Sequence, residues 1–170
     1  MRVVDDRLRC RALVQPEVMR VPAFSSDDSA EAGAIVRLML VEDHSMVTMA
    51  LVSAFESVDD IELAGQATSI DEAVQVAEGI RPDVVLLDRR LPDGDGIEAI
   101  AELHRVSPHS KVLVFTGVAD REVAERIAEA GGAGLLLKAG RLEDLLDTIR
   151  RVAAGEVFFD IEVPGRPTGR

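Results

Sequence analysis

Short apolar runs alternate with segments of helical periodicity five times along the chain. The apolar runs lie at 35–41, 61–67, 83–88, 111–116 and 134–138. Each is followed by a segment whose apolar positions recur at helical spacing, at 45–57, 70–79, 95–106, 120–130 and 141–154. Continuous apolar runs are typical of strands that are covered on both faces, as in a parallel sheet. The pattern therefore predicts an α/β protein with a doubly wound, five-stranded parallel sheet and five helices.

The two ends of the chain lack this alternation. Residues 1–34 contain Pro16, Pro22 and the polar run 25–29 without a sustained period, so we expect a poorly ordered N-terminal arm. Residues 156–170 end in Val-Pro-Gly-Arg-Pro-Thr-Gly-Arg, a composition typical of a tail or of the start of a linker to an absent output domain. The predicted domain is 35–155. Within it, Ser69 to Glu72 has the pattern of a capping box, with Thr68 as an alternative cap.

Composition excludes several classes of protein. A chain of 170 residues has the length of one domain, and its single cysteine excludes a disulfide framework. Residues 35–155 carry 12 Lys and Arg against 22 Asp and Glu. Nucleic-acid affinity depends on basic contacts, so we expect no direct binding of nucleic acid by this chain. No apolar run approaches the ~18 residues of a membrane span. We expect a cytoplasmic protein without membrane contact.

Charged and hydroxyl side chains stand where the predicted strands end. Glu42 and Asp43 follow the first strand, Asp88 ends the third, Thr116 ends the fourth and Lys138 ends the fifth. The carboxyl ends of parallel strands meet at one edge of a sheet, and ligands bind there near the point where the strand order reverses. With the flavodoxin-like order 2-1-3-4-5, the three carboxylates share this edge.

Three neighbouring carboxylates repel one another unless a cation binds between them. Oxygen ligands without cysteine favour Mg²⁺, with Mn²⁺ as an alternative. Asp88 is the candidate nucleophile for a phosphoryl group, while Thr116 and Lys138 would contact its oxygens. The alternative interpretation is that the acidic residues and Thr116 cap helices or turns and that Lys138 is a solvated strand end. The three histidines have no ligand spacing, and we interpret them as surface or packing residues: His44, His104 and His109.

Four blocks of the sequence resemble the receiver domains of bacterial two-component response regulators. They are Val-Glu-Asp-His at 41–44, Asp-Val-Val-Leu-Leu-Asp-Arg-Arg-Leu-Pro-Asp-Gly-Asp-Gly at 83–96, Val-Phe-Thr-Gly at 114–117 and Ala-Gly-Gly-Ala-Gly-Leu-Leu-Leu-Lys at 130–138. The resemblance spans roughly residues 35–154. The Leu-Leu-Lys ending, with no proline after Lys138, is similar to the NarL/LuxR-type subfamily.

The resemblance implies a signalling switch rather than an enzyme with a separate substrate. Asp88 would accept a phosphoryl group from a histidine kinase, and the domain would take part in its own phosphorylation and dephosphorylation. The resemblance also implies that Thr116 and Lys138 report the phosphoryl group to neighbouring elements. Mg²⁺ would be held by the side chains of three acidic residues and by one backbone carbonyl: Glu42, Asp43, Asp88 and Arg90, respectively.

Two departures from the family pattern bear on output. Leu135 stands where many relatives carry an aromatic switch residue. Residues 156–170 are too short for a DNA-binding domain, so we expect either a stand-alone receiver or the front part of a longer regulator. Two other functions stay open, a pseudo-receiver that only binds proteins and a Mg²⁺-dependent phosphohydrolase with an aspartate nucleophile. For a receiver, we expect a homodimer through the 120–130, 134–138 and 141–154 face or through the 45–57 and 141–154 face.

Overall fold

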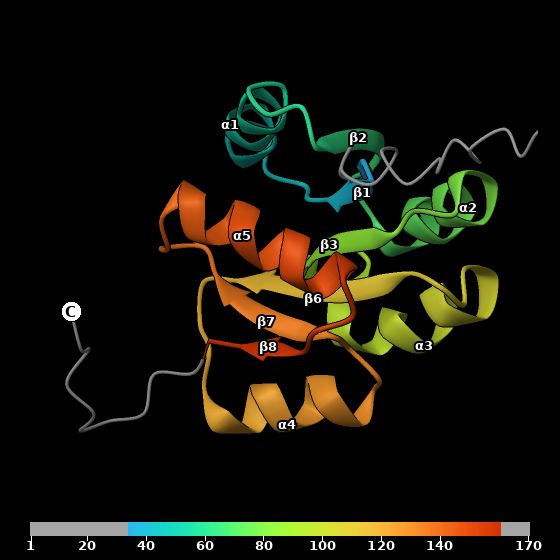
Figure 1. Cartoon of the computed structure of the whole chain (residues 1–170). Helices are drawn as coiled ribbons and strands as arrows, with labels where there is room; N and C mark the ends of the chain where they lie inside the picture. Colours follow the sequence, from blue (N-terminus) through green and yellow to red (C-terminus); the bar gives the residue numbers. More distant parts are fainter. Residues whose placement is uncertain (1–33, 161–170) are drawn as a thin grey trace, which may run out of the picture. The chain divides into compact units, whose positions relative to one another are not determined.

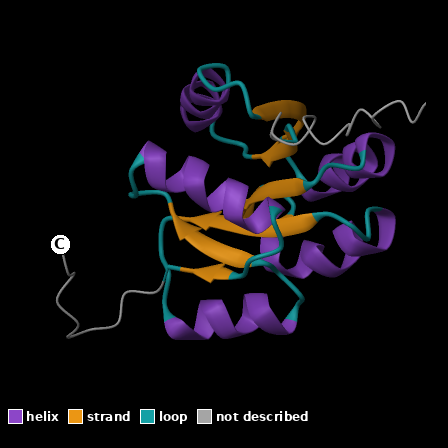
Figure 2. Ribbon diagram, in the orientation of Figure 1, coloured by secondary structure: helices purple, strands orange, loops and turns teal. Residues whose placement is uncertain are grey.

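The computed structural model describes residues 34–160, which contain five α-helices and eight β-strands (Figures 1 and 2). The helices are α1 (Ser45–Phe55), α2 (Ile70–Ile80), α3 (Gly96–Val106), α4 (Arg121–Glu129) and α5 (Leu142–Ala153). The strands are β1 (Val36–Val41), β2 (Ile61–Ala67), β3 (Val84–Asp88), β4 (Arg90–Leu91), β5 (Gly94–Asp95), β6 (Lys111–Thr116), β7 (Gly134–Leu137) and β8 (Phe158–Phe159). Residues 1–33 of the predicted N-terminal arm and 161–170 of the predicted tail lie outside the described residues.

The main sheet has six parallel strands in the order β2-β1-β3-β6-β7-β8. Its first five strands confirm the predicted order 2-1-3-4-5. The prediction of five strands was wrong by one, because β8 adds a sixth strand from residues that we had interpreted as a tail or linker. The remaining strands, β4 and β5, form a separate antiparallel hairpin between β3 and α3.

Apolar layers cover both faces of the sheet. Helices α1 and α5 pack on one face through residues such as Phe55 and Ile149, which are 1% and 0% exposed. Helices α2, α3 and α4 pack on the other face, where Ile100 and Ile127 are fully buried. Strand β3 has no exposed residue, as expected for a strand with helices above and below it. This burial explains why the strands read as continuous apolar runs.

The capping box that begins α2 differs from the prediction in one half. The Ser69 hydroxyl accepts a hydrogen bond from the Glu72 amide at 3.3 Å, as predicted. The Glu72 carboxylate, however, accepts from the amide and the hydroxyl of Thr68, at 2.8 and 3.0 Å, rather than from Ser69. Thr68 thus takes part through its own donors and not as the cap.

Within residues 34–160, no helix combines the length and the apolar character that are needed to cross a membrane.

Candidate functional site

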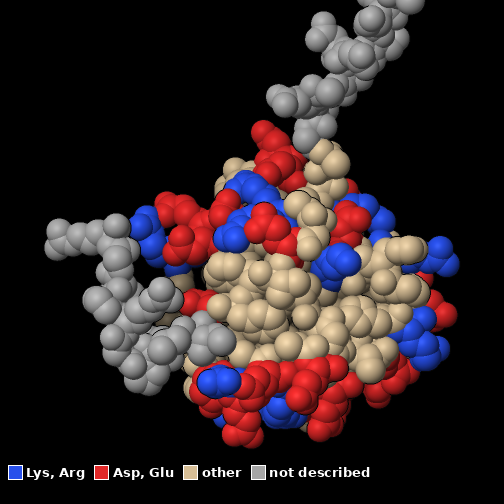
Figure 3. Space-filling view, turned by 60° about the horizontal axis from the view of Figure 1, so that its bottom comes forward, with Lys and Arg blue, Asp and Glu red and all other residues tan. Residues whose placement is uncertain are grey.

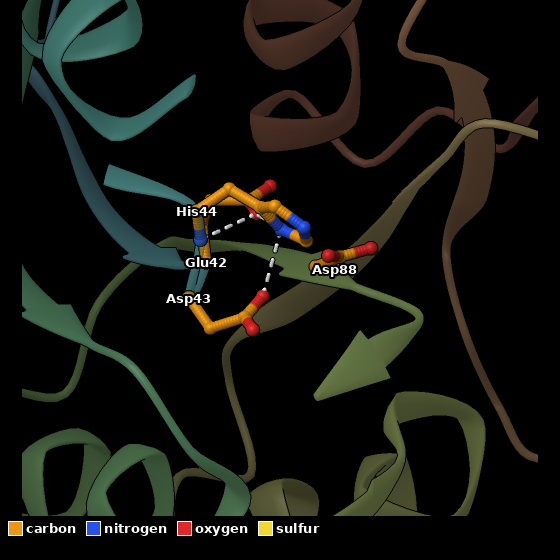
Figure 4. Close-up of side chains that lie close together, drawn as sticks. All are labelled: Glu42, Asp43, His44 and Asp88. Atoms are coloured by element: carbon orange, nitrogen blue, oxygen red, sulfur yellow. Dashed lines mark hydrogen bonds and ion pairs between the residues drawn. The ribbon is translucent and has the colours of Figure 1, made fainter. Parts of the chain in front are cut away.

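The predicted acidic residues meet at the carboxyl end of the sheet. Glu42 and Asp43 directly follow β1, and Asp88 is the last residue of the neighbouring strand β3 (Figure 4). One ligand atom from each of these residues and from His44 lies within 4.8 Å of the others. Glu42 and Asp88 are buried, at 2% and 4% exposure, whereas Asp43 and His44 are exposed. The carboxylates therefore lie close together at the carboxyl end of the sheet.

Lys138 joins the two buried carboxylates. Its Nζ atom lies 2.5 Å from Oε2 of Glu42 and 2.8 Å from Oδ2 of Asp88. The lysine follows β7, and its amide donates to the Thr116 carbonyl at 2.8 Å, which fixes its backbone beside the end of β6. A single ammonium group thus lies between two carboxylates that would otherwise repel each other.

The pairing sets the direction of each pKa shift. Burial acts to raise the pKa of Glu42, but hydrogen bonds from Lys138 and His44 outweigh it and lower the pKa. Burial also raises the pKa of Asp88; the hydrogen bond from Lys138 opposes this, the charge of Glu42 adds to it, and the pKa stays raised. Burial would lower the pKa of Lys138, yet its hydrogen bonds to Asp88 and Glu42 raise it. Lys138 is therefore firmly protonated at neutral pH.

Thr116 and Arg90 lie at the same end of the sheet. Thr116 lines a pocket of about 350 Å³ together with Asp88, Arg90 and Lys138, and its hydroxyl donates to the Val118 carbonyl at 3.2 Å. The Arg90 amide donates to Oδ1 of Asp88 at 3.3 Å. The structure thus brings all the predicted site residues to one end of the sheet, and in this arrangement Thr116 bonds to its own loop.

His44 is exposed, in agreement with its interpretation as a surface residue, but it also lies in the acidic cluster. Its Nδ1 atom lies 2.8 Å from Oε1 of Glu42 and 2.9 Å from Oδ1 of Asp43. The hydrogen bond to Glu42, and then the charges of Asp43 and Glu42, raise the pKa of the imidazole. Its position directly after the acidic pair was a signal for this placement, since three consecutive residues at a strand end share one edge.

Two further acidic residues hold the loop that follows Asp88. The Asp93 carboxylate accepts hydrogen bonds from the amides of Ile70 and Asp71 at 2.9 and 3.1 Å, which ties the β4–β5 hairpin to the start of α2. Asp95 caps α3 through the Ile97 amide at 3.0 Å and lies 3.2 Å from Nη2 of Arg126 on α4. Sequence reasoning did not assign these contacts; those of Asp93 with α2 and of Asp95 with Arg126 link segments more than 20 residues apart.

The acidic cluster has the chemistry of a metal site. Carboxylate oxygens from Glu42, Asp43 and Asp88 are hard ligands, which suit Mg²⁺ or Mn²⁺. In the β4–β5 hairpin, the Gly96 amide donates to the Arg89 carbonyl at 2.7 Å. The next pair, Arg90 and Asp95, is therefore a non-hydrogen-bonded pair of the antiparallel ladder, and its peptide groups point away from the partner strand. The residues present therefore fit a divalent cation at this edge.

The fold and this site define a receiver of the response-regulator class. The sequence profile of the response regulator receiver domain matches residues 38–150, and the chain belongs to this family. Members of the family are generally signalling domains and not enzymes with a separate substrate. The chain is 34% identical over 136 residues to the transcriptional regulatory protein LiaR of Bacillus subtilis, which covers 80% of this chain and 64% of LiaR. It is 32% identical over 128 residues to the response regulator protein VraR of Staphylococcus aureus, which covers 75% of this chain and 61% of VraR.

Solved structures of the LuxR type share the fold. A two-component response regulator of the LuxR family from Aurantimonas has a TM-score of 0.70 at 27% identity, over 74% of this chain and 89% of that one. A DNA-binding response regulator of the LuxR family from S. aureus has a TM-score of 0.65 at 26% identity, over 70% of this chain and 99% of that one. The chain spans less than two thirds of LiaR and VraR. These relatives give no support to the expectation that the chain does not bind nucleic acid.

Proposed function

We propose that this chain is a signalling switch that accepts a phosphoryl group on Asp88 from the phosphohistidine of a histidine kinase. The observation that carries the proposal is the position of Lys138, whose ammonium group contacts both buried carboxylates. Such a group can neutralise charge on an incoming phosphoryl group without forming a bond to it. The proposal includes a cytoplasmic location.

In the proposed reaction an Asp88 carboxylate oxygen attacks phosphorus. The new P–O bond forms as the P–N bond of the phosphohistidine breaks, and the electron pair of that bond stays on the leaving imidazole nitrogen. A Mg²⁺ ion, or Mn²⁺ in its place, would supply charge neutralisation for the phosphoryl oxygens. Glu42, Asp43 and Asp88 would hold this ion with the carbonyl of Arg90, while the Thr116 hydroxyl would turn from the Val118 carbonyl toward a phosphoryl oxygen.

Intact-mass measurement tests this assignment. The chain is incubated with a small phosphodonor and Mg²⁺, and we expect the mass of a single phosphoryl group to be added. The Asp88→Asn variant keeps the shape of the side chain but removes the nucleophilic carboxylate, so it should stay unlabelled while its circular dichroism spectrum is unchanged. Labelling of this variant to the same extent as the unaltered chain would contradict the assignment.

The face formed by α1 and α5 is the better candidate for a homodimer. Helix α1 contains no charged residue, and its Met46 and Met49 are 83% and 72% exposed. A pocket of about 220 Å³ borders α1 at Ala50 and Leu51, and its lining includes Leu145 as well as the charged Lys138 and Arg141. On the α4, β7 and α5 face, by contrast, β8 already pairs with the outer edge of β7. Exposed methionines on a helix without charged residues suit a self-complementary interface.

Sedimentation with a phosphoryl mimic tests this interface. Beryllofluoride with Mg²⁺ should increase the dimer fraction of the unaltered chain, because the mimic shifts the population toward the state with the higher dimer affinity. Met49→Glu should abolish the increase, and Glu125→Gln on α4 should leave it intact. An equal increase in the Met49→Glu variant would exclude the α1–α5 face.

A further inference from the structure

The segment after α5 lies along the outer edge of the sheet. We call residues 156–160 the C-terminal edge strand; they include β8, which runs parallel to β7 (Figure 1). The Phe158 amide donates to the Ala133 carbonyl at 3.0 Å, and the Asp160 amide donates to the Leu135 carbonyl at 2.9 Å. The segment thus occupies hydrogen-bonding groups that β7 would otherwise present at its edge.

A local turn directs the chain to this edge. Gly155, directly after the C-cap of α5, has a φ of 95°, a value that glycine adopts without steric cost. Its amide donates to the Val152 carbonyl at 2.9 Å, and the Glu156 amide donates to the Arg151 carbonyl at 3.0 Å. These two bonds form a Schellman motif, which fixes the direction of the chain after a helix. The turn therefore directs the chain back toward β7.

Side chains hold the segment in place on both sides. The Arg151 guanidinium lies 2.8 Å from the Glu156 carboxylate and 5.3 Å from the centroid of the Phe158 ring. Phe158 packs against the apolar layer that contains α1 and α5, whereas Phe159 packs against the layer that contains α2, α3 and α4. The two aromatic residues thus extend both layers beyond β7.

Gly134 lets a neighbouring strand lie unusually close to β7. A Cβ atom on Gly134 would lie 2.2 Å from the carbonyl oxygen of Phe158, so only glycine lets the two backbones approach this closely. Figure 3 is turned so that the side of Figure 1 on which α4 and β8 lie comes forward, and it shows a broad uncharged area beside a largely acidic rim. Within the C-terminal edge strand, the exposed Val157 and the half-buried Phe158 and Phe159 form an apolar run between Glu156 and Asp160.

We propose that the C-terminal edge strand prevents β7 from pairing with a second copy of this chain, and that its release exposes a dimerisation edge. An unpaired strand edge is a template for another strand, and proteins cover such edges with their own segments. Released, the Gly134–Leu137 strand would pair antiparallel with its counterpart across a two-fold axis, because that arrangement satisfies the same edge groups in both copies. This self-association needs no phosphoryl group and is independent of the proposed function.

The test compares two substitutions at one position in the full chain. Phe158→Pro removes the amide that donates to Ala133, whereas Phe158→Ala removes the ring but keeps that amide. Amide hydrogen exchange and sedimentation equilibrium are measured over a concentration series without phosphodonor. We expect the Asp160 amide to exchange roughly tenfold faster in Phe158→Pro than in Phe158→Ala, since a ladder bond next to it is lost.

The oligomeric state decides the proposal. Phe158→Pro should form a dimer at concentrations where the unaltered chain is monomeric, and dilution should shift the amide signals of residues 134–137. Gly155→Val strains the turn that directs the segment to β7, leaves the edge of β7 unchanged and should do the same, while thermal unfolding monitors that both variants are folded. Folded variants that release the segment and stay monomeric would overturn the proposal. Fast exchange of Asp160 in the unaltered chain would overturn it as well.

Discussion

Replacing Lys138 by methionine should destabilise the fold strongly, although the residue lies at the rim of the sheet. Methionine keeps most of the aliphatic length of the side chain and removes only the charge. Glu42 and Asp88 would then be two buried carboxylates without their shared cation, with side-chain exposures of 0% and 5%. The perturbation therefore tests whether the lysine holds the acidic cluster together in the absence of a bound ion.

The magnitude follows from the contact geometry. At 2.8 Å and an effective dielectric constant of about 20, the attraction between Nζ and one carboxylate oxygen is about 6 kcal/mol, much of which offsets the desolvation of the charges. Removing one partner of a buried ion pair costs about 3–5 kcal/mol, and the 22% exposure of Lys138 places the expected loss near the lower value. This is a large part of the free energy of unfolding of a small domain.

Urea unfolding at pH 7 in the presence of a chelator measures the loss. Lys111→Met is the matched control, because Lys111 is the chain's other lysine and is exposed at the start of β6. Its substitution should change the free energy of unfolding by less than about 0.5 kcal/mol. Equal losses in the two variants would refute the reasoning, because the bridge between Glu42 and Asp88 would then contribute nothing beyond an exposed charge.

The pH dependence of Lys138→Met gives a second check with a defined sign. Without the lysine, burial and mutual repulsion raise the pKa of both carboxyls, so the folded state binds protons more tightly than the unfolded state. Stability should therefore increase as the pH falls from 7 through the folded pKa values, and this gain should be complete below the unfolded values of about 4. A stability difference from the unaltered chain that stays constant between pH 7 and pH 5 would contradict this account.

Two further predictions concern the support of the site and the core. Asp93→Ala removes the acceptor for the amides at the start of α2 and should cost about 1 kcal/mol in urea unfolding at pH 7. The hydrogen bond from the Ile70 amide is the main cause of the lowered pKa of Asp93. The stabilisation by this carboxylate is therefore present above the unfolded pKa and is lost as the pH falls through the folded pKa. A stability difference between the variant and the unaltered chain that persists in full below the folded pKa would contradict this account. Ser110→Ala removes a buried hydroxyl that donates to the Pro82 carbonyl at 2.5 Å, and it should lower the free energy of unfolding by about 1–3 kcal/mol. Ser57→Ala is the control, because the Ser57 hydroxyl donates to the Ala54 carbonyl from an exposed position. A smaller loss in Ser110→Ala than in Ser57→Ala would show that water replaces the buried bond.

Much of the fold was predictable because burial on both faces leaves a strong pattern in the sequence. The run 111–116 is β6 without change, and the predicted helix at 120–130 is observed at Arg121–Glu129. Strand β8 was not predictable in this way, because two residues are too few to show a period. Its pairing depends on the Schellman turn at Gly155 and on the open edge of β7, which are both properties of the folded chain.

The site was predictable for the residues whose position follows from topology. A parallel sheet places the ends of neighbouring strands together, so the order of the strands was enough to bring Asp88 beside Glu42. The ammonium group between them was not predictable, because the path of a long flexible side chain depends on packing. The same limit applies to Asp93, whose partners on α2 lie 22 and 23 residues away along the chain.

The distribution of burial and charge argues that the acidic cluster is there for function and not for packing. The interior of β3 is fully apolar, and its four residues before Asp88 are 0% exposed. The two apolar layers therefore stabilise the sheet without help from its carboxyl end. At that end, Asp88 carries a desolvation cost that Lys138 only partly offsets, since the pKa of Asp88 remains raised. Natural sequences give up local stability at functional sites. A desolvation cost that is confined to the end of the sheet that carries the loops is therefore explained by a ligand that binds there.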